Sequence, residues 1–186
     1  MESENNLSLN EDQWRVMDRI AEALSAGADL AEGLQAGLEL LLDALERPGA
    51  ALYLPRCCEH FPQDWIFYNT PPAWQGILAS DETPVRHEIE RLLETGVIAP
   101  GDAERGYAAI FPILGANRIL GALLVDGPII APRDYPLWQA LLRPFGRIAL
   151  IHEQISGVDA SGVSSYLELM RSRNILRALF DNLPIS

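Results

Sequence analysis

The feature that most constrains the fold of this chain is a pair of apolar runs in the stretch Gly106 to Asp126, GYAAIFPILGANRILGALLVD. A short Gly-Ala-Asn turn joins the two runs, which predicts a β-hairpin. Successive residues of a strand point to opposite faces, and in both runs the side chains expected on either face are apolar. A half-solvated antiparallel strand alternates apolar with polar residues, so this hairpin must be covered on both sides. The sequence therefore predicts a central sheet between two layers.

Length and charge limit the class of protein. The 186 residues suffice for one domain with tails, and 14 basic against 26 acidic side chains give a net charge of −12. Such a charge repels phosphate backbones, and no run of Lys or Arg offers a basic patch, so nucleic acid is not an expected partner. No apolar run approaches the roughly 20 residues that a bilayer span needs, and the N-terminus is polar and acidic. We expect no membrane span and a cytoplasmic location.

Helical periodicity predicts two helices ahead of the sheet. The first runs from about Glu11 to Ala26, with a capping-box pair at Ser8 and Glu11 and Asn10 as a competing cap. The second follows Asp29 and carries a broad leucine stripe that ends at Pro48-Gly49. This second helix is expected to lie on the sheet.

Short strands are predicted at Ala50 to Leu54 and Trp65 to Tyr68, with a loop between them. A single helical turn follows near Trp74, and then a helix that Thr83-Pro84 begins and Gly96 ends. His87 lies off the apolar face of that helix and is expected to point to solvent.

A long helix is predicted to follow the hairpin, opening near Asp134. Its apolar side chains keep heptad spacing, but Pro144 interrupts the run, and we expect a kink or a restart near Arg143. The stretch 156–165, SGVDASGVSS, has the composition of a flexible joint.

This order of elements resembles a GAF domain over roughly Leu30 to Ile155. The most specific part is the hairpin, with Phe111-Pro112-Ile113-Leu114 before the turn and Ile119-Leu120-Gly121-Ala122-Leu123 after it. The resemblance implies an α+β fold with a central antiparallel sheet of about six strands. It also implies terminal helices on one face of the sheet, and short helices and loops that form a small-molecule pocket on the other.

A second resemblance lies at the end of the chain, where the stretch 174–186 is similar to the helix that enters a PAS domain. We therefore expect an N-terminal helix at 1–28, a GAF-like domain at 29–156, and a linker with a signalling helix at 157–186. The two resemblances together imply the N-terminal piece of a sensor histidine kinase or a cyclic-di-GMP enzyme, with PAS and output domains further along the same chain.

The expected function is that of a non-enzymatic sensory and dimerisation module. Its pocket either holds a small molecule, whose presence the C-terminal helix relays, or is filled by the chain's own aromatic side chains. Candidate pocket residues are the aromatics and polar groups near the expected pocket: Trp65, Phe67, Tyr68, Trp74, Arg86, Tyr107 and Phe111. A homodimer through the terminal helices is expected, with the heptad seam as its interface: Trp138, Leu141, Phe145, Ile148, His152 and Ile155. For His152 a dimer contact is the preferred interpretation, and a proton sensor is the alternative.

Cys57 and Cys58 carry the alternative function, a thiol-based redox switch or thiol enzyme. With His60 they also supply zinc-ligand types, but adjacent cysteines point apart, so no metal site is expected. Both cysteines precede the second strand, whereas bilin-binding GAF domains hold the chromophore by a cysteine well after it, so no covalent bilin is expected. The identity of any other cofactor stays open. No catalytic constellation emerges from the spacing of the remaining residues.

Overall fold

A computed structural model describes residues 10–27, 29–55, 65–80 and 83–156 of the chain. These residues form an α+β fold around one antiparallel sheet of five strands, against the expected six or so, in the order β2-β1-β5-β4-β3. The strands are β1 (Ala50–Tyr53), β2 (Trp65–Tyr68), β3 (Ala99–Asp102), β4 (Tyr107–Leu114) and β5 (Ile119–Val125). The helices are α1 (Glu11–Ala26), α2 (Leu30–Ala44), α3 (Pro72–Ala79), α4 (Pro84–Thr95) and α5 (Tyr135–Ser156), with a short 3₁₀ turn, η1 (Pro132–Asp134).

The predicted hairpin is confirmed as β4 and β5, which pair from Ala109 opposite Val125 to Leu114 opposite Ile119. Pro112 lies opposite Ala122 in this ladder. Every residue from Tyr107 to Ile113 is buried, as are those from Leu120 to Val125. The hairpin is therefore covered on both faces, as its apolar pattern predicts.

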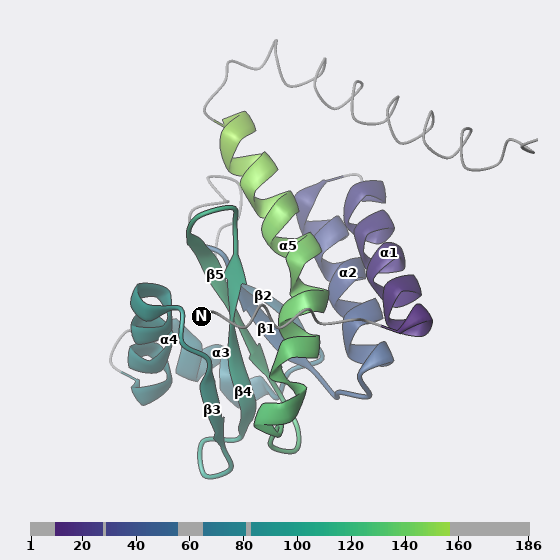
Figure 1. The fold of residues 1–186 in the computed structure, drawn as a ribbon. Helices are drawn as coiled ribbons and strands as arrows, with labels where there is room; N and C mark the ends of the chain where they lie inside the picture. The colour runs from purple at the N-terminus through teal and green to yellow at the C-terminus, as the bar shows by residue number, and fades with distance from the viewer. Residues whose placement is uncertain (1–9, 28, 56–64, 81–82, 157–186) are drawn as a thin grey trace, which may run out of the picture. The chain divides into compact units, whose positions relative to one another are not determined.

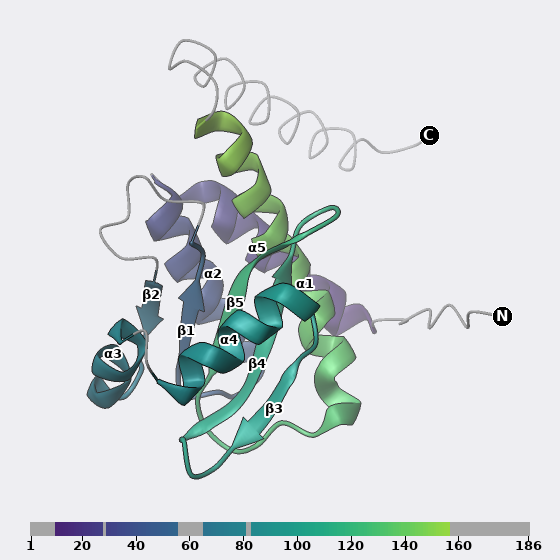
Figure 2. The ribbon, with the colours of Figure 1, turned by 90° about the vertical axis from the view of Figure 1, so that its left-hand side faces the viewer.

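Helices cover the two faces unequally. Figures 1 and 2 show α1, α2 and α5 on one side of the sheet and α3 and α4 on the other. The larger core lies on the α1–α2–α5 side, where Leu34, Leu38 and Phe145 are fully buried. The smaller one lies under α3 and α4, where Ile89 and Leu92 of α4 pack on Ile110 of β4. Each face of the sheet thus has a hydrophobic core of its own.

Local sequence explains where the helices begin and end. Asn10 rather than Ser8 caps α1, because its side chain accepts from the backbone N–H of Gln13 while Gln13 bonds back to the Asn10 N–H. The Thr83 hydroxyl caps α4, and Gly96 ends that helix with φ at 70°, a left-handed conformation that glycine adopts without strain. His87 is exposed on α4, as expected.

Three elements differ from the sequence prediction. α3 extends over eight residues instead of a single turn. β3, which reads Ala-Pro-Gly-Asp, was not expected, because Pro and Gly are depleted in strands; it is an edge strand that pairs only with β4. α5 does not restart near Arg143 but runs as one helix through Pro144.

The heptad seam of α5 faces the protein's own core, which corrects the expected dimer interface. Trp138, Leu141 and Phe145 are at most 2% exposed and pack in the large core against the sheet. A helix that packs on a sheet needs the same three- and four-residue apolar spacing as a coiled-coil seam, so spacing alone did not separate the two. Ile148 also packs partly on this core, whereas a role for His152 or Ile155 in a dimer stays a prediction.

The chain divides into two compact units, 1–150 and 151–186, and the structure describes only the end of α5 in the second. Cys57, Cys58 and His60, the expected joint at 156–165 beyond Ser156, and the PAS-like stretch lie outside the described residues. None of the helices in the described ranges combines the length and hydropathy that crossing a bilayer requires.

Candidate ligand site

Strand pairing decides which predicted site residues share a face. Tyr53 of β1 lies opposite Trp65 of β2, and Ala51 lies opposite Phe67. Successive side chains of a strand point to opposite faces, so these four share one face, and it is the face that α3 and α4 cover. The alternate residues of the two strands, Tyr68 among them, contact the large core on the opposite face.

Aromatic side chains cluster beneath α3 and α4. The rings of Tyr53 and Trp65 lie 4.7 Å apart between centroids, and those of Trp65 and Phe67 lie 6.0 Å apart with nearly parallel planes. Trp74 from α3 and Tyr107 from β4 complete the cluster and are buried. The result is an apolar region with a few polar tips.

Arg86 is the cation of this cluster. It follows buried Val85 on α4, which places it at the edge of the face that the helix turns toward the sheet. Its side chain is only 17% exposed, against 60% for Arg91 on the same helix. A guanidinium held this close to an apolar cluster lies in a region of reduced dielectric, where its attraction to an opposite charge is stronger than in water.

The guanidinium of Arg86 lies over the ring of Tyr53. Its Cζ atom is 4.6 Å from the ring centroid, and Nη2 donates a hydrogen bond of 2.9 Å to the Tyr53 hydroxyl. Nε is 3.5 Å from a carboxylate oxygen of Glu90, one helical turn further along. These contacts hold a planar, bidentate donor among aromatic rings, and such a donor binds carboxylates and phosphates.

Burial raises the pKa of the Tyr107 hydroxyl, with Glu88 adding to the effect and Arg105 opposing it. The phenol therefore stays protonated at neutral pH and keeps its ability to donate a hydrogen bond. Among the described groups of this site, none is a nucleophile paired with a base.

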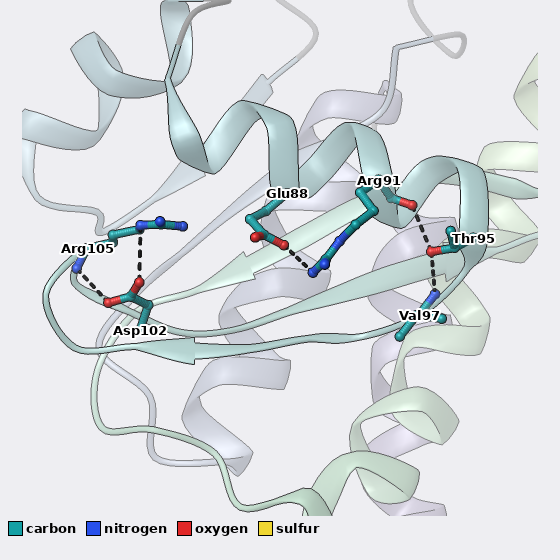
Figure 3. Close-up of polar contacts among 6 residues, drawn as sticks. All are labelled: Glu88, Arg91, Thr95, Val97, Asp102 and Arg105. Carbon is teal, nitrogen blue, oxygen red and sulfur yellow. Dashed lines mark hydrogen bonds and ion pairs between the residues drawn. The ribbon is translucent and has the colours of Figure 1, made fainter.

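Polar contacts fix the outer surface around the site (Figure 3). Arg91 pairs with Glu88 along α4, and the Thr95 hydroxyl donates to the Arg91 carbonyl at 2.8 Å. Asp102 accepts from the backbone N–H of Arg105 at 3.1 Å and pairs with its side chain, which closes the turn between β3 and β4. α4 and the β3–β4 turn thus have their own local anchors, independent of Arg86.

Five of the seven predicted pocket residues share this cluster: Trp65, Phe67, Trp74, Arg86 and Tyr107. The structure places the other two, Tyr68 and Phe111, on the opposite face of the sheet. Phe111 stacks on Trp138 of α5, with centroids 5.1 Å apart and planes 8° from parallel. It is a core residue of the α1–α2–α5 side.

Sequence reasoning missed Tyr53 and Glu90. The spacing of Arg86 and Glu90 is that of an i, i+4 pair and was readable in the helix pattern. Tyr53 had no such signal, because its contact with Arg86 spans 33 residues and depends on the pairing of β1.

The described ranges contain no group of three or more His, Cys, Asp or Glu side chains placed to hold a metal ion. The cysteine pair that carries the thiol hypothesis lies outside those ranges, so the hypothesis stays open.

No model of a known protein family matches the sequence, and no curated protein matches it. Among solved structures it is similar to the GAF domain of a phosphoenolpyruvate-protein phosphotransferase from Acinetobacter, with a TM-score of 0.57 at 13% identity over 79% of this chain and 98% of that one. It is also similar to the GAF domain of the corresponding protein from Coxiella burnetii, with a TM-score of 0.51 at 14% identity over 78% of this chain and 96% of that one. At these identities the likeness establishes the fold, and the expected GAF-like fold is confirmed.

Proposed function

We propose that this chain, whose fold is that of a GAF domain, is a non-enzymatic sensory module that binds a small anionic molecule beneath α4. The observation that carries the proposal is the placement of Arg86, a mostly buried guanidinium stacked over Tyr53 within an aromatic cluster. A cation in such surroundings gains from an anionic partner, because the reduced dielectric strengthens their attraction. Its planar fork suits a carboxylate or a phosphate.

The aromatic side chains around Arg86 define the rest of the ligand. Trp65 and Phe67 are half-buried and offer flat apolar surfaces next to the guanidinium. A ligand with an anionic group and a flat apolar body would use both features at once. We therefore infer an organic anion rather than an inorganic ion.

Ligand binding would act through the contacts that it replaces. An anion on Arg86 competes with the 2.9 Å hydrogen bond to Tyr53 and with the ion pair to Glu90. Tyr53 lies on β1, which pairs with β5, and α4 packs on the sheet through Ile89. A ligand that prefers one arrangement of α4 against the sheet shifts the population toward that arrangement.

The wider setting is part of the proposal. The PAS-like stretch 174–186 supports a place ahead of PAS and output domains, in a sensor histidine kinase or a cyclic-di-GMP enzyme, inside the cell. A homodimer would then use the C-terminal part of α5, where His152 and Ile155 lie, because the earlier part of the seam is core.

Thermal-shift titration against a panel of small carboxylates, phosphates and nucleotides tests this function. We expect at least one flat organic anion to raise the melting temperature of the wild-type chain in a saturable way. Arg86→Gln should abolish that rise, because the amide cannot form a bidentate charged pair.

Arg91→Gln is the matched control, since it removes the same charge from an exposed position of the same helix. It should leave the ligand-dependent rise unchanged. If both variants lost the rise equally, the effect would come from net charge and not from the position of Arg86. An unchanged rise in Arg86→Gln would show that Arg86 does not bind the ligand.

A further inference from the structure

A concave surface lies on the side of the sheet opposite to the Arg86 cluster, between α5 and the end of the β4–β5 hairpin. Figures 1 and 2 both show the hairpin end beside α5. The groove there has a volume of about 490 Å³. One wall is the hairpin end, with Leu114, Gly115 and Ala116, and the other is α5. Leu114 is 46% exposed, so the groove presents an apolar side chain to solvent.

Its α5 wall is a regular stripe. Gln139, Arg143, Arg147 and Leu150 recur at three- and four-residue steps along one side of the helix. At 1.5 Å per residue the stripe is about 16 Å long, or roughly three helical turns. Gly146 forms the closest point between the walls, because its backbone approaches that of Leu114. The α5 wall of the groove therefore runs along the helix axis.

Arg143 and Arg147 give the groove its charge. Both are exposed, and neither makes an ion pair or a hydrogen bond within the described ranges. In a chain with a net charge of −12, acidic neighbours pair with most other arginines whose contacts are described. Two arginines one turn apart, beside exposed Leu114 and partly buried Leu150, favour an occupant with apolar and acidic side chains.

Two other occupants, an added β-strand and a second copy of this chain, fit less well. An added strand would pair with the part of β4 beyond Ile110, which β3 leaves free. That part contains Pro112, which has no N–H to donate to the added strand. A second copy that met this surface symmetrically would place Arg143 and Arg147 against their own counterparts, and like charges repel. An amphipathic helix of a partner protein fits better than either.

We propose that the groove between α5 and the β4–β5 hairpin docks an acidic amphipathic helix, with apolar side chains on Leu114 and Leu150 and carboxylates on Arg143 and Arg147. Helices bind grooves of this kind through apolar residues at i, i+3, i+4 and i+7. The inference does not depend on a ligand at Arg86, because the two sites lie on opposite faces of the sheet.

Fluorescence anisotropy with a defined probe tests the proposal. The probe is a labelled helical peptide of about four turns, with leucines at i, i+3, i+4 and i+7 and glutamates flanking them. We expect saturable binding to the wild-type chain, weakened at least about tenfold by Arg143→Glu with Arg147→Glu. The matched control is Arg19→Glu with Arg133→Glu, which changes the net charge equally at exposed positions outside the groove. It should leave binding within about twofold of wild type.

Amide chemical shifts locate the contact. The peptide should perturb the signals of Leu114 to Ala116 and of α5, and a peptide with lysines for its glutamates should not bind. Absence of saturable binding, equal weakening by the control pair, or perturbation confined to other elements would overturn the proposal. Concentration-dependent self-association that only the groove variants abolish would assign the surface to a second copy instead and would also overturn it.

Discussion

Replacing Gly146 by alanine tests how α5 meets the sheet. A Cβ built at Gly146 lies 1.9 Å from the carbonyl oxygen of Leu114. Carbon–oxygen contacts of this kind need about 3.3 Å, so the helix or the hairpin end has to move by more than about 1 Å. Overpacking costs about 1–3 kcal/mol, and the better helix propensity of alanine returns up to about 1 kcal/mol. Because the clash is with backbone atoms, we expect the upper end of that cost and a net loss of about 2 kcal/mol in the free energy of unfolding.

Gly76→Ala is the matched control, because a Cβ at Gly76 of α3 meets no atom within 4 Å. It should stabilise the chain by up to about 1 kcal/mol. Urea denaturation followed by tryptophan fluorescence measures both changes, and all four tryptophans lie before residue 150. Gly146→Ala with wild-type stability or better would refute the close approach of α5 to the hairpin.

Three further changes follow from the same contacts. Phe111→Ala removes a fully buried ring stacked on α5 and should cost about 3–5 kcal/mol in urea denaturation, whereas Leu114→Ala, at a half-exposed position, should cost less than about 1 kcal/mol; similar losses would contradict the burial of Phe111. Tyr53→Phe keeps the ring under Arg86 but loses the hydroxyl, and should cost about 0.5–1.5 kcal/mol in the same assay; a neutral result would show that the hydrogen bond does not contribute. Burial lowers the pKa of His152 below 6.5, so the unfolded chain takes up the proton first and stability falls as the pH drops below that value. His152→Gln should flatten this fall between about pH 7.5 and 5.5 in a urea series, and an unchanged slope would assign it to other groups.

Features carried by long apolar patterns were predictable from the sequence. The hairpin, α1 and α4 appear where the apolar spacing and the caps place them, and α2 begins where expected but ends at Ala44, ahead of Pro48-Gly49. Each of these elements has many residues that agree on one period, and such agreement identifies the element type. The covering of the sheet on both faces followed from the hairpin alone, because a strand that is apolar on both faces has to be buried on both.

The face of the sheet that each side chain takes, and the pairing of the strands, were harder to predict. β2 has only four residues, Trp-Ile-Phe-Tyr, all of them apolar or aromatic, so its sequence does not say which face each side chain takes. Pairing with β1 settles that Trp65 lies under α4 while Tyr68 lies on the other face. The first part of the α5 seam, Trp138 to Phe145, was wrong as a predicted interface for a related reason. An apolar stripe shows that its side chains are buried, and only the fold shows which surface they pack against.

The Arg86 site combines features that local sequence predicts with one that depends on strand pairing. α4 and its i, i+4 pair with Glu90 are local features, whereas Tyr53 joins them only through the sheet. The proposed function requires that the chain holds a small organic anion at this guanidinium. Native mass spectrometry of the purified chain, compared with the same sample after denaturation, measures this directly, and it also gives the number of copies in the assembly. We predict an extra mass on the folded wild-type chain that is lost on denaturation and is absent from Arg86→Gln. A folded wild-type chain without extra mass, or an Arg86→Gln variant that retains it, would contradict the account.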